Sequence, residues 1–160
     1  MTTLGKSTFL WLGLALTASA GIAIAQKAAE LDPAVAARQA QMRLVGYHTG
    51  ILGAMAKGER EYDAELARLA ATNLNTAASF ENATMWIEGT EQGVAEGTRA
   101  KAEIWSDSAG FAEKYDQLGQ ASAAMIDAAG TDLDALKAAM GDLGGACKAC
   151  HEDYRGPENK

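Results

Sequence analysis

The whole chain of 160 residues contains only two prolines, Pro33 and Pro157. Proline removes a backbone donor and breaks helices, whereas alanine, which is abundant here, is a strong helix former. The long region between the two prolines is therefore free to form helices. Its apolar residues recur at helical spacing and show no strand pattern. The sequence predicts an all-α protein.

The apolar spacing predicts four helices, over residues 33–57, 62–80, 99–128 and 131 to beyond 151, with a long connection over 81–98. The first begins at Asp32-Pro33, a capping acid followed by proline, and ends at Gly58. Thr131, with Asp134 three residues on, is expected to cap the fourth helix. Four amphipathic helices without strands predict an antiparallel four-helix bundle.

The segment Cys147-Lys148-Ala149-Cys150-His151, inside the fourth predicted helix, has the pattern of covalent haem attachment. Two thiols bond to the two vinyl groups of one haem, and the adjacent imidazole ligates the iron. Residues three and four apart share a helix face, so all three side chains can meet one porphyrin. The chain has no other cysteine. We therefore predict one covalently bound haem c per chain, with His151 as the axial iron ligand.

Other uses of two cysteines explain this motif less well. A structural zinc site needs four protein ligands, and the only other histidine, His48, is far away in sequence. A thioredoxin-like pair normally lies near a βαβ pattern, which this sequence does not show. A plain disulfide stays open, but it gives His151 no role.

The N-terminal segment has the layout of a secretory signal. Lys6 is followed by a short apolar run and by small residues that end in Ala23-Ile24-Ala25. The apolar run is shorter than the roughly 20 residues that a spanning helix needs. We expect residues 1–25 to be cleaved, which leaves residues 26–160 as one exported, periplasmic domain without a membrane anchor.

The formal net charge is −7 at pH 7. Nucleic-acid binding depends on neutralising phosphates with lysine and arginine, so an acidic chain argues against it. An acidic surface is compatible with steering toward a basic protein, here a redox partner.

Four segments carry a family resemblance. Residues 38–42 read Arg-Gln-x-x-Met, residues 57–63 hold Lys-Gly-Glu followed by Tyr-Asp, residues 103–107 read Glu-Ile-Trp-Ser-Asp, and residues 147–155 read CKACHEDYR. Together they resemble the cytochrome c′ family, in which the haem motif lies at the end of the last helix of a four-helix bundle. The resemblance extends over essentially all of residues 26–160.

The resemblance implies roles for further residues. Cys147 and Cys150 would form the thioethers. Arg38 and Gln39 would meet the haem edge and its propionates, where guanidinium–carboxylate geometry is favourable. Arg155 would place its charge beside the proximal imidazole. Thr98 would supply a polar contact from the loop before the third helix.

Met42 corresponds to the residue that faces the sixth coordination position in this family. A thioether can pack as an apolar wall, which leaves the iron five-coordinate. It can also ligate iron, as in six-coordinate low-spin proteins that resemble cytochrome c-556. The sequence leaves both open, with Met42 as a cofactor contact in the first case and a second axial ligand in the other.

The resemblance also implies function. It implies single-electron transfer by a haem protein, with binding of nitric oxide or carbon monoxide as the alternative, and a homodimer of the kind common in the family. An enzyme such as a peroxidase finds little support, because no distal histidine is positioned by the sequence.

Overall fold

The structure is a computed structural model that describes residues 31–158, so the predicted signal peptide, residues 1–25, lies outside the described residues. The elements are α1 (Pro33–Ala56), α2 (Ala64–Ala78), the 3₁₀ helix η1 (Ala83–Met85), α3 (Glu103–Ser106), α4 (Ser108–Thr131) and α5 (Leu133–Tyr154). Over residues 31–158, β-type pairing is limited to two isolated bridges. The all-α prediction is confirmed.

The ends of α1 follow directly from the local sequence. The Asp32 carboxylate accepts hydrogen bonds from the backbone nitrogens of Ala34 at 2.8 Å and Val35 at 3.4 Å. Pro33 occupies the first turn, where no backbone donor is needed. Beyond the other end, Gly58 has a φ of 75°, a left-handed conformation that glycine adopts without steric cost. Both predicted ends of this helix are confirmed.

The third predicted helix, over residues 99–128, is wrong at its start. The chain first forms the short α3 and then breaks at Asp107, whose φ of −124° and ψ of 55° are not helical. The Asp107 carboxylate accepts from the backbone nitrogen of Gly110 at 3.2 Å. An aspartate at this position satisfies a free donor of a new helix, and α4 therefore begins at Ser108.

The predicted cap of the last helix is also wrong. Asp132 caps α5, since its carboxylate accepts from the backbone nitrogen of Ala135 at 2.8 Å. Thr131 is the last residue of α4 instead, and its hydroxyl donates to the carbonyl of Asp127 at 2.8 Å. Asp132 is thus the single residue that joins α4 to α5.

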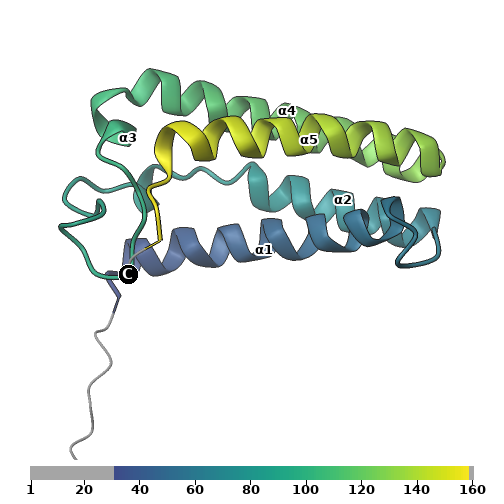
Figure 1. Ribbon diagram of the computed structural model, residues 1–160, viewed down its shortest axis with the longest axis horizontal. Helices are drawn as coiled ribbons and strands as arrows, with labels where there is room; N and C mark the ends of the chain where they lie inside the picture. Colours follow the sequence, from purple (N-terminus) through teal and green to yellow (C-terminus); the bar gives the residue numbers. More distant parts are fainter. Residues whose placement is uncertain (1–30, 159–160) are drawn as a thin grey trace, which may run out of the picture.

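The helices α1, α2, α4 and α5 form an antiparallel four-helix bundle (Figure 1). Neighbours pack in the order α1, α2, α4, α5, and α1 and α5 make the least contact of the four adjacent pairs. The core is built of leucine, methionine and alanine. Burying one leucine or methionine contributes about 1.5–3 kcal/mol. Six such side chains are essentially fully buried: Leu52, Met55, Leu74, Met125, Leu136 and Leu143.

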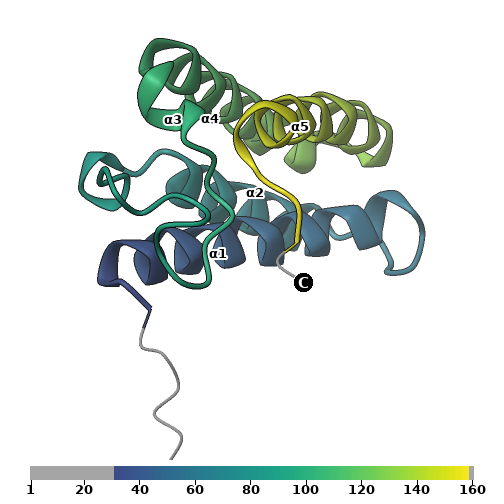
Figure 2. The same ribbon diagram turned by 60° about the vertical axis from the view of Figure 1, so that its left-hand side comes forward.

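One end of the bundle is closed by the long connection between α2 and α4 and by α3 (Figure 2). A second apolar cluster lies here, made by Ala100, Ile104, Phe111 and Tyr154. The connection contains η1 and three glycines with positive φ, Gly89, Gly93 and Gly97. The predicted long connection over 81–98 is confirmed. None of the helices in residues 31–158 has both the length and the apolar character of a membrane span.

Candidate functional site

The attachment motif lies in the last two turns of α5. Cys147, Cys150 and His151 are each half-buried, and the two thiols are not joined to each other. Cys147 packs against the main core and Cys150 against the second apolar cluster. The motif therefore spans the junction between the bundle core and the closed end.

Burial controls the protonation of these three side chains. It raises the pKa of the Cys147 thiol, and burial followed by the neighbouring Cys147 raises the pKa of Cys150. Burial lowers the pKa of His151, and the positive charges of Arg155 and Arg99 lower it further. His151 is therefore held in the neutral form, which is the form that ligates a metal.

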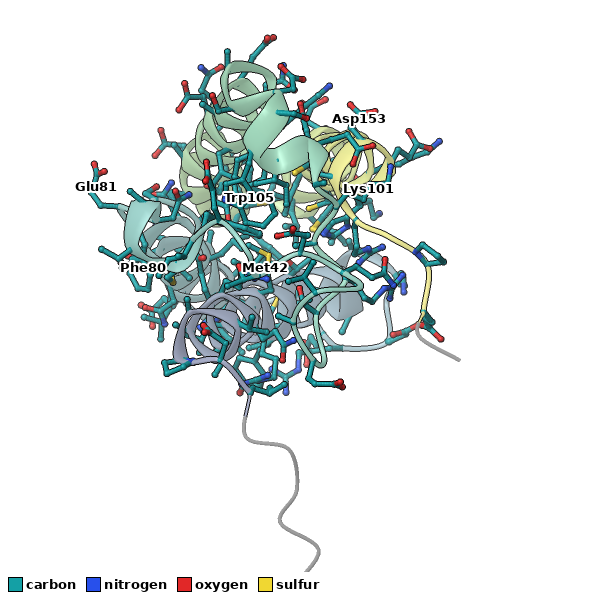
Figure 3. All side chains as sticks on the ribbon, turned by 90° about the vertical axis from the view of Figure 1, so that its left-hand side faces the viewer. Met42, Phe80, Glu81, Lys101, Trp105 and Asp153 are labelled. Carbon is teal, nitrogen blue, oxygen red and sulfur yellow. The ribbon has the colours of Figure 1, made fainter. Side chains whose placement is uncertain are left out.

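The residues opposite the motif come from α1, which runs antiparallel to α5 (Figure 1). A Cβ added to Gly53 of α1 would lie 3.6 Å from the terminal methyl of Met140 of α5, which fixes the register of the two helices. Met42 precedes Gly53 by as many residues as His151 follows Met140. Because both helices rise by about 1.5 Å per residue, Met42 lies level with His151. Figure 3 shows Met42 on the interior side of α1.

We call the region where Met42, Gly46 and Thr49 on one face of α1 lie opposite Gly144, Cys147 and His151 on one face of α5 the slot. A Cβ added at Gly46 or Gly144 would meet no atom within 4 Å. A flat porphyrin needs such open space beside the thiols that tether it, so these residues fit a haem. The adjacent Gly145 lies outside the slot, in a hollow on the outer face of α4 and α5.

Arg38, one turn before Met42 on α1, is buried and tightly bound. Its Nη1 donates to the carbonyl of Met85 at 3.2 Å and to Oγ1 of Thr90 at 2.7 Å. Its Nη2 donates to the carbonyl of Thr90 at 2.6 Å and to Oγ1 of Thr98 at 2.7 Å. These bonds fasten the connection to α1.

The partners of Arg38 are all neutral oxygens. It makes no ion pair within residues 31–158, although it is only 4% exposed. Burial accordingly lowers the pKa of Arg38, which the charge of Asp32 partly opposes. A buried cation without a carboxylate partner suits a site that takes up a cofactor with carboxylate groups. The Nη groups themselves are committed to the connection.

The structure brings the other residues implied by the resemblance to the same end of the bundle. Thr98 is 2% exposed and also accepts from the backbone nitrogen of Ala100 at 3.1 Å. The Gln39 side chain donates to the carbonyl of Gly97 at 2.8 Å, so it holds the connection from outside. Arg155 is exposed and ends α5, and its charge acts on His151 through space.

Backbone hydrogen bonds that sequence patterns do not predict hold the end of α5. The backbone nitrogen of Lys101 donates to the carbonyl of Tyr154 at 3.1 Å, and that of Gly156 donates to the carbonyl of Arg99 at 2.7 Å. The Lys101 ammonium donates to the carbonyls of Glu152 and Asp153 at the end of the helix (Figure 3). We call residues 99–101 paired with 154–156 the strap.

Tyr154 and Asp107 are a second pair that sequence reasoning misses. The Tyr154 hydroxyl donates to Oδ2 of Asp107 at 2.7 Å, which links the end of α5 to the start of α4. Tyr154 lies in the motif-bearing segment 147–155, and Asp107 ends the Glu-Ile-Trp-Ser-Asp segment. Both lie in segments that carry the family resemblance, and this is the only signal that could have found them.

Comparison with known proteins identifies related chains. A family model described as cytochrome c′ matches residues 33–155. A cytochrome c-554 from Cereibacter sphaeroides is 44% identical over 144 residues, which cover 89% of this chain and 94% of the relative. A cytochrome c′ from the same organism is 40% identical over 142 residues, covering 89% and 95%. A cytochrome c-556 from Agrobacterium tumefaciens is 32% identical over 118 residues, covering 74% and 93%.

Solved structures of cytochromes c′ superpose on most of this chain. The structure of a cytochrome c′ from Rhodobacter sphaeroides superposes with a TM-score of 0.76 at 41% identity, covering 78% of this chain and 96% of that chain. A nitric oxide complex of a variant of cytochrome c′ from Alcaligenes xylosoxidans superposes with a TM-score of 0.69 at 36% identity, covering 78% and 94%.

Proposed function

This chain belongs to the cytochrome c′ family and carries covalently bound haem c, and we propose that it is an exported single-electron carrier with a five-coordinate iron. The observation that carries the proposal is the position of the motif: Cys147, Cys150 and His151 are half-buried on α5, opposite α1, and Gly46 and Gly144 leave open space between these helices. Bound haem supplies a metal centre that gains and loses one electron.

The side chains of the slot support this role. Cys147 and Cys150 would hold the cofactor, and His151, whose pKa is lowered by burial and by Arg155, would ligate the iron. The buried charge of Arg38 lies on the slot side of α1, one turn before Met42. A positive charge in a poorly solvated site favours the form that has gained an electron.

Met42 lies level with His151 on the other wall, so its side chain would be the one to meet the second face of a bound haem. We assign it as an apolar wall, because the neighbouring Arg38-Gln39 pair resembles the five-coordinate members of the family. The test is the optical spectrum of the purified ferrous protein and of Met42→Ala. A high-spin spectrum in both supports the assignment. A low-spin spectrum that becomes high-spin in Met42→Ala overturns it and establishes a six-coordinate His/Met carrier, as in cytochrome c-556.

A second function, binding of diatomic gases, is supported by the nitric oxide complex among the similar structures. A five-coordinate iron leaves one position for nitric oxide or carbon monoxide. Titration of the ferrous protein with carbon monoxide tests this directly. A spectrum that does not change on addition of the gas contradicts it.

Location and partners complete the proposal. We assign residues 1–25 as a signal for export to the periplasm, which the mass of the mature protein tests. A basic redox protein is the proposed partner, because the chain carries a net charge of −7.

A homodimer is proposed through α1 and α2, where Leu44, Tyr47 and Leu69 are exposed. Sedimentation of the holoprotein tests it, and a monomer at high concentration contradicts it.

A further inference from the structure

A hollow of about 240 Å³ opens between the connection and the first turns of α4, at the closed end of the bundle. Trp105, one of its lining residues, lies near the centre of the end view in Figure 3. We call this hollow the aromatic pocket, because four rings dominate its walls. Its apolar lining is made by Trp86, Ile104, Trp105, Phe111, Ala112 and Tyr115.

The lining excludes charged ligands. The only polar contributions besides the indole and phenol groups come from Asn82 and Ser108. Burial raises the pKa of Tyr115 to about 12, so its hydroxyl is neutral at ordinary pH. An ion entering this pocket would lose its water without gaining an opposite charge, which is costly.

Two rings of the aromatic pocket contact residues of the helices that bound the slot. The guanidinium carbon of Arg38 lies 4.8 Å from the centroid of the Trp86 ring, and Arg38 is one turn from Met42 on the slot side of α1. On the other side, Phe111 packs against Tyr154 with ring centroids 5.2 Å apart. Cys150 packs against the same apolar cluster.

Trp86 is the ring that lies between the aromatic pocket and Arg38. It packs edge-on against Phe111, with centroids 4.9 Å apart, and against Tyr115 at 6.2 Å. Its Nε1 is buried and lies beside the Tyr115 hydroxyl.

We propose that the aromatic pocket takes up small uncharged gas molecules, of the class of carbon monoxide and nitric oxide, and passes them beside Trp86 into the slot. The proposal rests on the gas-binding part of the proposed function. Apolar cavities of about 150 Å³ bind benzene or xenon, so the volume here is ample for a diatomic molecule.

The test replaces a small side chain at the exposed edge of the aromatic pocket with a larger one. Ala112→Leu adds bulk inside the aromatic pocket without touching the slot. Ala121→Leu is the matched control, because Ala121 is also on α4 and lines the hollow on the outer face of α4 and α5. We expect the bimolecular association of carbon monoxide with the ferrous holoprotein to slow severalfold in Ala112→Leu and to stay unchanged in Ala121→Leu.

Xenon provides a readout that does not involve the iron. Crystals of the holoprotein under xenon pressure should show the atom in the aromatic pocket, and crystals of Ala112→Leu should not. Wild-type protein that binds carbon monoxide, together with an unchanged rate in Ala112→Leu or a pocket without xenon, overturns this inference alone. Wild-type protein that binds no carbon monoxide overturns the gas-binding function itself.

Discussion

Nη2 of Arg38 donates to Oγ1 of Thr98 at 2.7 Å, and the two residues are 60 positions apart in the sequence. Arg38 belongs to α1, while Thr98 belongs to the connection that closes the end of the bundle. The bond is buried, and it joins the helix that carries Met42 to the segment that becomes the strap. The Arg38 guanidinium therefore couples the position of the connection to the position of α1, which carries Met42.

Replacing Thr98 with valine should destabilise the folded holoprotein by about 2 kcal/mol, because a buried charged donor loses its acceptor. The backbone nitrogen of Ala100 loses the same oxygen. Urea unfolding followed by far-UV circular dichroism measures the effect. Thr72→Val is the control, since the Thr72 hydroxyl is exposed and bonds only within its own helix. Equal effects from the two variants would contradict the role of Thr98.

Two glycines of α4 should respond oppositely to alanine. A Cβ at Gly110 would lie 2.6 Å from the Tyr154 hydroxyl and would also collide with the Asp107 carboxylate. Gly110→Ala should therefore break the Tyr154–Asp107 bond and cost about 2 kcal/mol. Gly119 has open space, so Gly119→Ala should stabilise the helix by up to about 1 kcal/mol. Thermal unfolding of both variants measures the difference, and the same sign in both refutes the argument.

Two tyrosines should make the fold sensitive to alkali. The bond from Tyr154 to Asp107 raises the pKa of Tyr154 to about 12, and burial raises that of Tyr115 to about 12. Both ionise near 10 in the unfolded chain, so the folded state keeps protons that the unfolded state loses. This contribution is full below about pH 10 and disappears as the pH rises toward about 12.

Thermal midpoints measured by circular dichroism between about pH 9 and about pH 12 test this dependence. Tyr115→Phe and Tyr154→Phe should each flatten the decline. Tyr47→Phe is the control, because Tyr47 is 65% exposed and should leave the curve as it is. If neither Tyr115→Phe nor Tyr154→Phe changes the fall in the thermal midpoint, other groups cause the loss of stability at high pH.

Filling the slot should reduce cofactor uptake. Gly144→Leu puts a side chain into the open space between α1 and α5, whereas Gly141→Leu puts the same side chain into the outer hollow. The ratio of haem to protein after expression should fall in the first variant and stay near one haem per chain in the second. Full haem content in Gly144→Leu would show that the cofactor does not occupy the slot.

Local sequence rules predict a helix end correctly where one or two residues determine it. Asp32, Pro33 and Gly58 fix α1, because capping and left-handed turns depend on single residues. The same rules fail at Asp107 and at Thr131–Asp132. A short polar residue can cap a helix or lie inside one, and adjacent candidates compete, so tertiary packing selects among them.

In the candidate site, too, some features can be predicted from the sequence and others cannot. Cys147, Cys150 and His151 are found from their spacing alone, and Arg38, Gln39, Thr98, Met42 and Arg155 come from the family resemblance. The partners of Arg38 cannot be predicted in this way. Met85 ends the short η1 and Thr90 lies in irregular backbone, and no periodicity relates either residue to a helix distant in sequence.

The strap has a consequence for the iron ligand. Residues 154–156 follow the attachment motif directly, so the strap anchors the end of the helix that carries both thiols and His151. Breaking the strap would leave the thioether bonds intact, because they are covalent, but it would release the helix end that positions the imidazole.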